Sequence, residues 1–339
     1  MNVPARAPSP DLAGRPLDRL AEALGPDLDA VALVIRERMA SEAAPRIPAV
    51  TAHLIEAGGK RLRPMLVLAA ARLMGYEGAH HVDLAAVVEF IHTATLLHDD
   101  VVDESRQRRG RPTANLLWDN KSSVLVGDYL FARAFQLMVR PGNLHVLDIL
   151  SDAAATIAEG EVLQLVAARD LATTEATYLK VIRGKTAALF AAACRIAAVV
   201  AERPEAEEQA LDSYGRNLGV AFQLVDDAID YVSEAGVMGK DAGDDFREGK
   251  MTLPVILAHA RGSADDKRFW KDAVEGRRAS DEDFAHAIGL VRRTRAVDDT
   301  LARARHYGQR AIDAIAGFAP GRAKDAMVEA VEFAVARAY

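Results

Sequence analysis

Two clusters of aspartates with the same spacing are the residues in this sequence most suited to chemistry. The first begins at Asp99 in HDDVVDES, and the second begins at Asp226 in FQLVDDAID. In each cluster the first and last aspartates are four residues apart, which on a helix puts both carboxylates on one face, about 6 Å apart along the axis. Unpaired carboxylates at that distance repel each other. The spacing therefore indicates a bound hard cation such as Mg²⁺, although a solvated acidic turn would fit either cluster alone.

The second cluster interrupts an apolar stretch, because residues 219–225 before it are mostly apolar. Burying ionised carboxylates is costly unless they are paired or bind a metal ion. Two matched clusters in one chain indicate carboxylates on facing helices with several divalent ions between them. The ligand that suits such a site is a polyanion, and diphosphate is the natural candidate.

Basic segments accompany the acidic clusters. The segment GGKRLRP at 58–64 places Lys60 and Arg63 after a glycine turn, as a phosphate clamp would need, although a plain basic loop fits the same residues. The run 106–111 brings four arginines directly after the first cluster. We expect 184–186, Gly-Lys-Thr, to open a helix over 187–201, where a lysine, a hydroxyl and free backbone N–H groups can bind an anion.

The longest polar interruption is 233–254, whose glycines indicate a mobile loop. It carries Lys240 and Lys250, which as parts of a lid would close over an anionic ligand, while a solvated loop of mixed charge is the alternative. The segment 255–339 has helical periodicity with charged outer faces, and we assign it to the scaffold.

Composition predicts the elements that must position these groups. Half of the 339 residues are hydrophobic, aromatic residues are few, and the long segments have helical periodicity. The net charge of -7 argues against nucleic-acid binding, and Cys194 lies in an apolar run as a core residue. No run of 18 apolar residues and no signal pattern occurs, so we expect a cytoplasmic protein. We expect residues 1–16 to be a disordered tail and residues 17–339 to form one domain.

The helices expected from periodicity and breakers are 17–43 (one or two helices), 65–74, 80–98, 113–138, 144–168, 173–182, 187–201 and 205–231. The helix 80–98 runs into the first aspartate cluster. Counted back from Asp99, the residues nearest its face are Leu96, Thr95, His92, Val88 and Leu84, with no aromatic ring among them. This stripe is either an ordinary core face or one wall of a deep apolar tunnel beneath the metal site.

The motifs taken in order resemble the trans-isoprenyl diphosphate synthases of the polyprenyl synthetase family. They are GGKRLRP, HDDVVDESRQRRG, GKT, FQLVDDAID and GKDAGDDFREGKMTLP, and they span residues 58–254. The resemblance implies an all-α, isoprenoid-synthase-type helical bundle around a central apolar cavity, acting as a homodimer. It implies repeated condensation of isopentenyl diphosphate onto an allylic diphosphate such as farnesyl diphosphate, with three Mg²⁺ ions per site.

The resemblance also implies roles for individual residues. The metal ligands would be Asp99, Asp100, Asp103, Asp226, Asp227 and Asp230. The allylic diphosphate would be held by Arg108, Lys185, Thr186, Gln223 and Lys240, and isopentenyl diphosphate by Lys60, Arg63, His92 and Arg109. Lys250 joins the substrate-binding residues as a cation of the polar loop. The residues expected to carry catalysis are Asp99, Asp103, Lys185, Asp226 and Asp227.

Product length is expected to follow from the residues just before the first cluster. The resemblance implies that short-product members carry bulky aromatics four or five residues before the first aspartate, where this chain has Thr95 and Ala94. We therefore expect a long-chain product, about octaprenyl to decaprenyl, that supplies a quinone side chain. A peripheral membrane contact for product release is a further expectation.

Several alternatives fit part of the pattern. A shorter-chain synthase and a catalytically silent partner subunit share the family's motifs. A terpene cyclase resembles the chain at the first cluster but has a different second metal motif. Glu89 and His92 form a Glu-x-x-His pair like those of ferritin-like di-metal bundles, which need two such pairs.

Overall fold

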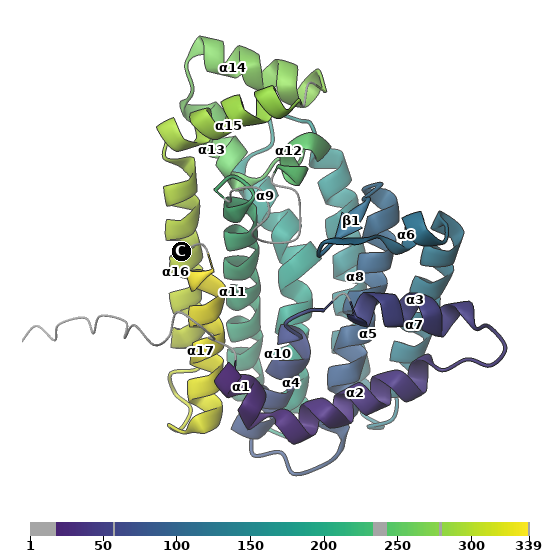
Figure 1. Cartoon of the computed structure of the whole chain (residues 1–339). Coiled ribbons are helices and arrows are strands. Elements are labelled where there is room, and N and C mark those ends of the chain that lie inside the picture. The colour runs from purple at the N-terminus through teal and green to yellow at the C-terminus, as the bar shows by residue number, and fades with distance from the viewer. Residues whose placement is uncertain (1–17, 57, 233–242, 278–279, 338–339) are drawn as a thin grey trace, which may run out of the picture.

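The computed structural model describes residues 18–56, 58–232, 243–277 and 280–337, and most of them lie in helices (Figure 1). In this described part the sole sheet is a two-stranded antiparallel hairpin, β1 (Gln107–Arg108) paired with β2 (Arg111–Pro112). The predicted all-α class is therefore confirmed. The predicted N-terminal tail and Lys240 lie outside the described residues.

The helices of the described residues follow one another along the chain with short connections. In order they are α1 (Asp18–Ala23), α2 (Gly25–Met39), α3 (Arg46–Glu56), α4 (Leu62–Leu73), α5 (His80–Val102), α6 (Ala114–Leu117), α7 (Asn120–Met138), α8 (Leu144–Ala167), α9 (Glu175–Ile182), α10 (Ala188–Val200), α11 (Glu205–Ile229), α12 (Asp244–Glu248), α13 (Leu253–Arg261), α14 (Ala264–Trp270), α15 (Asp281–Arg293), α16 (Ala296–Ala314) and α17 (Arg322–Ala336). Two π-helical segments, η2 (Arg183–Ala187) and η3 (Lys271–Glu275), follow α9 and α14. None of the described helices is both long enough and apolar enough to cross a membrane.

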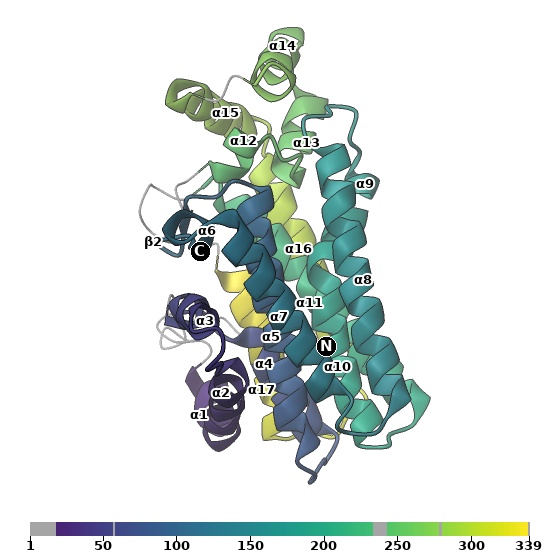
Figure 2. The same ribbon diagram turned by 90° about the vertical axis from the view of Figure 1, so that its right-hand side faces the viewer.

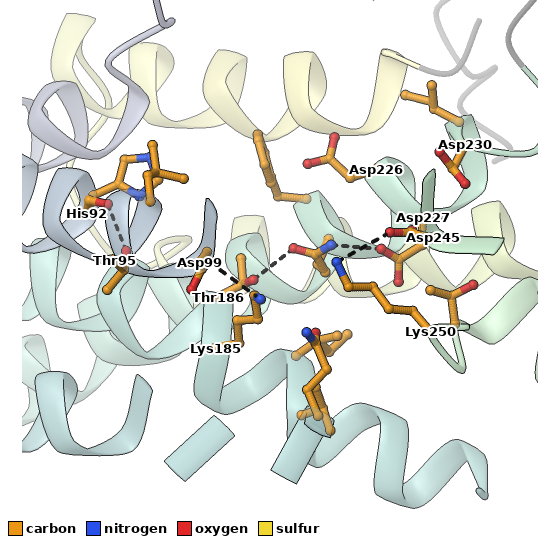
Figure 3. A pocket seen from close by; sticks show the side chains of 18 of the residues that line it. His92, Thr95, Asp99, Lys185, Thr186, Asp226, Asp227, Asp230, Asp245 and Lys250 are labelled. Atoms are coloured by element: carbon orange, nitrogen blue, oxygen red, sulfur yellow. Dashed lines mark hydrogen bonds and ion pairs between the residues drawn. The ribbon is translucent and has the colours of Figure 1, made fainter. Parts of the chain in front are cut away.

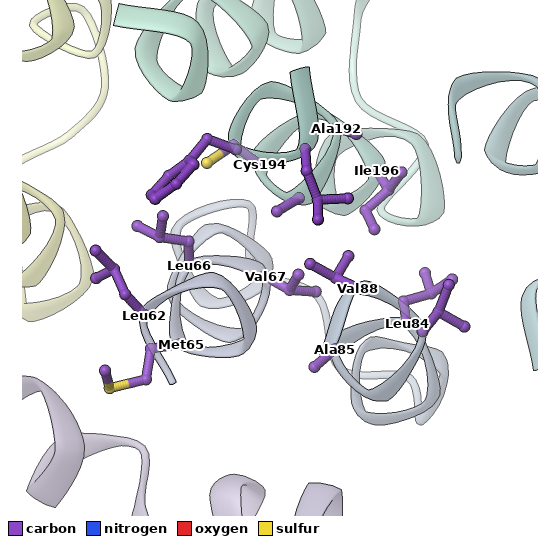
Figure 4. Packing of buried hydrophobic residues seen from close by; sticks show 14 of the residues in the cluster. Leu62, Met65, Leu66, Val67, Leu84, Ala85, Val88, Ala192, Cys194 and Ile196 are labelled. Carbon is purple, nitrogen blue, oxygen red and sulfur yellow. The ribbon is translucent and has the colours of Figure 1, made fainter. Parts of the chain in front are cut away.

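The long helices run side by side in an upright bundle, and the purple α1 and α2 lie across its lower end (Figures 1 and 2). The central helix α10 contacts α4, α5, α8 and α11. Its sequence, ALFAAACRIAAVV, is rich in alanine, so its neighbours can approach closely, and Cys194 is fully buried there. Figure 4 shows α10 packed against Leu66 and Val67 of α4 and against Leu84 and Val88 of α5.

A second group of buried residues lies at the opposite end of the bundle and joins α12 to α13–α15. Trp270 and Tyr231 are among its fully buried side chains. Phe246 of α12 packs against the rings of Trp270 and Phe284, with centroids 6.4 and 5.6 Å away. This packing anchors α12, which follows the undescribed part of the polar interruption.

Two predicted helices differ from the observed ones. The predicted helix 113–138 is broken between α6 and α7, because Asp119 caps α7 by accepting the Ser122 N–H at 2.6 Å. The predicted helix 80–98 continues through α5 to Val102, so Asp103 becomes its C-cap.

The prediction that Gly-Lys-Thr opens a helix is wrong. The segments α9, η2 and α10 follow one another without a break, so Lys185 and Thr186 lie in the interior of a helical run with no free N-terminal turn. This helical run also crosses α8 closely at η2. A Cβ atom placed on Gly160 would lie 2.5 Å from the backbone nitrogen of Lys185, so only glycine fits there.

Candidate active site

A cavity of about 780 Å³ lies between α4, α5, α8, η2, α11 and α17. Both aspartate clusters reach it, from opposite sides (Figure 3). The predicted site residues that line it are Lys60, Arg63, His92, Asp99, Asp103, Arg108, Arg109, Lys185, Thr186, Gln223, Asp226, Asp227, Asp230 and Lys250. The fold thus brings together segments that span most of the sequence.

Asp100 is the predicted metal ligand that the structure places elsewhere. Its side chain is fully buried, and it is not among the described residues that line the cavity. One of its carboxylate oxygens accepts from Arg108 Nε at 2.8 Å and from Arg108 Nη2 at 2.7 Å. On a helix, adjacent residues point about 100° apart, so Asp100 faces away from Asp99. This geometry makes Asp100 the partner that orients Arg108 and does not support a metal-binding role.

The other two aspartates of the first cluster contact lysines. Lys185 Nζ lies 3.6 Å from Asp99 Oδ2 and 2.7 Å from Glu161 Oε2 on α8. Lys250 Nζ donates to Asp103 Oδ2 at 3.0 Å. Burial raises the pKa of Glu161 to about 7, with the negative charge of Asp99 adding to the rise and Lys185 opposing it. Burial is thus the main reason why Glu161 resists ionisation, and Lys185 offsets part of it.

Asp227 in the second cluster anchors a buried hydrogen-bond chain. Tyr178 donates to Asp227 Oδ2 at 2.5 Å, and Gln223 Nε2 donates to Asp227 Oδ1 at 2.7 Å. Thr186 in turn donates to Gln223 Oε1 at 2.8 Å. Burial raises the pKa of Asp227 to about 7, and both hydrogen bonds oppose that rise. The chain fixes the amide of Gln223 and links α9, η2 and α11 at the cavity wall.

The remaining aspartates of the second cluster have different partners. The guanidinium of Arg337, at the end of α17, contacts the carboxylate of Asp226 and also stacks 4.4 Å from the ring centroid of Phe222. Asp230 Oδ1 accepts the backbone N–H of Gly243 at 3.2 Å. The second cluster is therefore tied to the C-terminal helix and to the start of α12.

The predicted isopentenyl diphosphate residues gather on the α4 and α5 side of the cavity. Arg63 Nη1 donates to His92 Nε2 at 3.2 Å, and the Arg63 guanidinium stacks 4.5 Å from the ring of Phe190. Burial lowers the pKa of His92 well below its usual range, and nearby arginine charges lower it further, so the ring is neutral. Its Nε2 must then accept, because arginine can only donate. Lys60 lies over the ring of Phe333 at 4.2 Å.

Sequence reasoning misses several residues of the site. The segment 255–339 reads as scaffold by its periodicity, yet Phe333 and Arg337 line the cavity. No spacing in the sequence links Arg337 to Asp226, so only the fold could show it. Tyr178 was missed because the sequence predicted separate helices over 173–182 and 187–201, whereas the structure has one continuous helical run that includes both Tyr178 and Lys185.

The predicted tunnel wall is only partly exposed to the cavity. His92, Thr95 and Leu96 line it, whereas Leu84 and Val88 are fully buried in packing against α4 and α10 (Figure 4). Thr95 donates to the backbone oxygen of His92 at 2.7 Å. The lower half of the stripe is therefore core in this structure.

The donor chemistry of the cavity fits hard divalent cations. Carboxylate oxygens on opposite walls suit Mg²⁺ that also binds phosphate oxygens. In the described part of the chain, however, no three His, Cys, Asp or Glu side chains converge to hold an ion. The reason is visible in the contacts above: Lys185, Lys250 and Arg337 contact the carboxylates in this state. A metal bound here would take over those contacts.

Comparison with known proteins agrees with this site. The chain matches the model of the polyprenyl synthetase family over residues 44–291. It is 42% identical over 325 residues to the octaprenyl diphosphate synthase of Haemophilus influenzae, which covers 95% of this chain and 98% of that protein. A decaprenyl diphosphate synthase from Rhodobacter capsulatus is similar in structure, with 58% sequence identity, a TM-score of 0.91, and coverage of 95% of this chain and 99% of that one. A polyprenyl synthase from Caulobacter crescentus, complexed with calcium and isoprenyl diphosphate, is also similar in structure. Its sequence identity is 48% and its TM-score 0.93, and the match covers 99% of this chain and 100% of that one.

The family match covers more than half of the chain, and the similar proteins match it almost from end to end. The resemblance inferred from the motifs is thereby confirmed, and the ferritin-like alternative is wrong. The chain belongs to the polyprenyl synthetase family and is a long-chain trans-prenyltransferase.

Proposed function

We propose that this enzyme condenses isopentenyl diphosphate repeatedly onto an allylic diphosphate such as farnesyl diphosphate, giving an all-trans product of about octaprenyl to decaprenyl length. The observation that carries the proposal is one cavity in which two aspartate clusters face each other among basic side chains. The names of the similar octaprenyl and decaprenyl synthases support the product length.

Divalent ions, which we take to be three Mg²⁺, would be held by Asp99 and Asp103 on one wall and by Asp226, Asp227 and Asp230 on the other. When bound, they would neutralise the diphosphate leaving group. The calcium in the Caulobacter structure supports a divalent metal in that protein. Asp227 must give up its internal hydrogen bonds to ligate, so we expect it to bind last or to act mainly by positioning Gln223.

The basic residues would divide between the two substrates. Lys185, Thr186, Gln223, Lys250 and Arg108 line the part of the cavity beside the clusters and would hold the allylic diphosphate. Lys240, which lies outside the described residues, would be a further cation for the allylic diphosphate. The isopentenyl diphosphate would be held by Lys60, Arg63, His92 and Arg109.

Arg337 would add to the binding of isopentenyl diphosphate. Its Nε and Nη1 atoms are buried without a hydrogen-bond partner among the described residues. Buried donors of this kind are costly when unpaired, so they indicate a place for an anionic ligand. Arg337 also lowers the pKa of Lys60, after the larger effect of burial, which shows that the two cations are close.

The chemistry follows from these charges. The basic side chains stabilise the diphosphate as the bond between C1 and its oxygen breaks, leaving an allylic cation. The C3–C4 double bond of isopentenyl diphosphate attacks C1 through C4, which forms the new bond and moves the positive charge to C3. A proton then leaves C2 to the departing diphosphate and forms the new double bond. The lengthened allylic diphosphate is the primer for the next cycle.

We also propose a homodimer. Apolar residues on α7 and α8 are unusually exposed, and the two helices lie side by side (Figure 2). These residues are Val124, Leu125, Phe135, Val139, Val162, Leu165 and Val166. Monomers rarely expose a large apolar patch, so a second copy of the chain would cover it. The cytoplasm as location, a quinone side chain as the destination and a peripheral membrane contact during product release complete the proposal.

Incubation with Mg²⁺, farnesyl diphosphate and labelled isopentenyl diphosphate tests the proposal by product length. Products of eight to ten isoprene units are expected. Asp226→Asn should abolish them, whereas Asp212→Asn, which removes an exposed carboxylate from the same helix, should not. Products of three or four units would contradict the proposed long-chain product and favour a shorter-chain synthase. Absence of products from folded protein would favour a silent subunit.

A further inference from the structure

Lys250 follows a tight turn at the end of α12. Gly249 ends the helix in the left-handed region, with φ of 74°. The N–H of Gly249 donates to Phe246 O at 3.1 Å, and the N–H of Lys250 donates to Asp245 O at 2.9 Å. The Lys250 side chain reaches the cavity, where Nζ donates to Asp103 at 3.0 Å and also contacts the carboxylates of Glu248 and Asp245 on α12. The direction of Lys250 therefore depends on how firmly α12 and the turn after it are held.

Arg169 holds this turn from outside the cavity. Its backbone N–H donates to Gly249 O at 2.9 Å. Its guanidinium donates from Nη2 to Arg247 O and from Nη1 to Val274 O, both at 3.2 Å. A Cβ atom on Gly249 would lie 2.7 Å from Arg169 Cγ, so the arginine stem packs directly on the glycine backbone. Arg169 thus bridges the end of α8, the turn after α12 and η3.

The chemistry of arginine suits this position. A guanidinium is planar and carries five N–H donors in a fixed fork, so it can bridge two carbonyl groups on different segments. Arg169 itself has φ of 60°, a conformation that costs a non-glycine residue free energy and persists only where surrounding contacts hold it. Burial lowers the pKa of its guanidinium, and the positive charge of Arg277 lowers it further.

We infer that Arg169 is a positioning residue for prenyl transfer, which acts by directing Lys250 toward the allylic diphosphate. Arg169 is not among the described residues that line the cavity, so it would act on substrate through its neighbours. Of these, the turn before Lys250 is the segment that Arg169 holds with both its backbone N–H and its guanidinium. The inference rests on the proposed role of Lys250 in binding the allylic substrate. It predicts that loss of Arg169 weakens the binding of the allylic substrate while leaving the binding of isopentenyl diphosphate unchanged.

A double-mutant cycle tests the inference. The affinity of the intact enzyme for the unreactive thiolo analogue of farnesyl diphosphate, with Mg²⁺, is measured by calorimetry for Arg169→Ala, Lys250→Ala and the double variant. Arg169→Ala should weaken binding about tenfold, and it should add nothing in the Lys250→Ala background, because residues that act through one another are not additive. The KM for isopentenyl diphosphate should stay within about twofold. Arg268→Ala, at an exposed arginine, is the matched control.

The outcomes separate the inference from the function on which it rests. If Lys250→Ala weakens binding but Arg169→Ala does not, or if the two effects add, Arg169 does not position Lys250. If Lys250→Ala leaves binding unchanged, the proposed role of Lys250 fails and the inference fails with it. If the alanine variant does not fold, Arg169→Lys replaces it, since one ammonium keeps part of the bridge. This variant should lose less affinity for the allylic analogue, and the loss should again depend on Lys250. A loss that persists without Lys250 would again overturn the inference.

Discussion

Lys250 Nζ lies 3.0 Å from Asp103 Oδ2, although 147 residues separate them in the chain. The same arrangement recurs at Asp99, which faces Lys185, and at Asp226, which contacts Arg337. Protein cations thus neutralise in this state three of the five carboxylates that we propose bind metal. A metal ion and a diphosphate arriving together would exchange these contacts, with the metal on the carboxylates and the cations on the phosphates.

We predict that Mg²⁺ with inorganic diphosphate stabilises the protein more than either ligand alone. Mg²⁺ alone would displace the lysines and Arg337 from the aspartates and leave these cations unpaired, and diphosphate alone would leave the aspartates unpaired. Together, Mg²⁺ pairs with the aspartates and diphosphate with the displaced cations. A jointly bound pair at 100 times its Kd would add about 2.7 kcal/mol to the free energy of unfolding. Thermal unfolding checks this, with Ca²⁺ and sulfate as comparisons. Simple additivity of the two ligands would contradict the exchange of contacts.

The pH dependence should report on Asp227 together with Glu161, whose pKa burial also raises to about 7. Burial raises the pKa of Asp227 from 3.8 to about 7. The folded metal-free protein then binds more protons than the unfolded chain between about pH 4 and pH 7, so its free energy of unfolding falls as the pH rises through that interval. Activity should instead increase as the pH rises through that interval, because metal binding needs the ionised carboxylate. We expect kcat/KM to fall as the pH drops below about 7.

Tyr178→Phe should shift to higher pH the point below which kcat/KM falls, which is the acid limb of the pH–rate profile. The hydrogen bond from Tyr178 lowers the pKa of Asp227 against the larger effect of burial, so its loss should raise that pKa by up to about one unit. The acid limb of the pH–rate profile would then shift to higher pH. Tyr214→Phe is the matched control, since it removes a buried hydroxyl that donates to Met327 O. Equal profiles for Tyr178→Phe and the parent enzyme would rule out the hydrogen-bond chain as a functional unit.

Thr95 and Ala94 are expected to differ in their effect on product length. Thr95 lines the cavity, and Ala94 is fully buried away from its described lining. Thr95→Tyr should shorten the products, because the ring would occupy the space below the first aspartate cluster. Ala94→Tyr should instead overpack the core, at about 1–3 kcal/mol of stability.

Product chromatography beside thermal unfolding distinguishes the two positions. Shorter products from Ala94→Tyr would support the sequence-based expectation and show that the cavity opens toward this residue during elongation. An unchanged product ladder from Thr95→Tyr would contradict a path past that side chain.

A charged residue on the exposed faces of α7 and α8 should disrupt the proposed dimer. Leu125 and Val166 are 66% and 73% exposed, so replacing either by aspartate costs little within one subunit. Light scattering should show dissociation for Leu125→Asp and Val166→Asp. Leu33→Asp, at a 50% exposed residue of α2, should leave the mass unchanged. A parent protein that is monomeric at micromolar concentration would contradict the proposed dimer.

Arg337→Gln should raise the KM for isopentenyl diphosphate by about tenfold or more. The variant loses a charged donor to the diphosphate, and charge-assisted hydrogen bonds contribute about 1.5–3 kcal/mol. The KM for the allylic substrate should change less. Arg216→Gln, which breaks an exposed pair with Asp212, is the control. An effect on both substrates equally would place Arg337 outside the isopentenyl diphosphate site.

The sequence by itself determined the helical class, the family and many of the residues that meet in the cavity. The helical class depends on the period of 3.6 and the two carboxylate clusters on four-residue spacing, whereas the substrate-binding residues followed from the resemblance of the motifs. Tyr178 was out of reach, because its helical phase relative to Lys185 exists only in the continuous run of α9, η2 and α10, which the sequence divided into two helices.

Only the tertiary structure decided which partner each group takes. Asp100 turns to Arg108, Asp226 meets Arg337 from the last helix, and Gly160 lets α8 cross the helix that carries Lys185. These contacts join residues far apart in the chain, and their energies depend on burial and on close approach between helices. No local spacing encodes such contacts, so the sequence could name most of the charged groups but not which cation contacts each carboxylate.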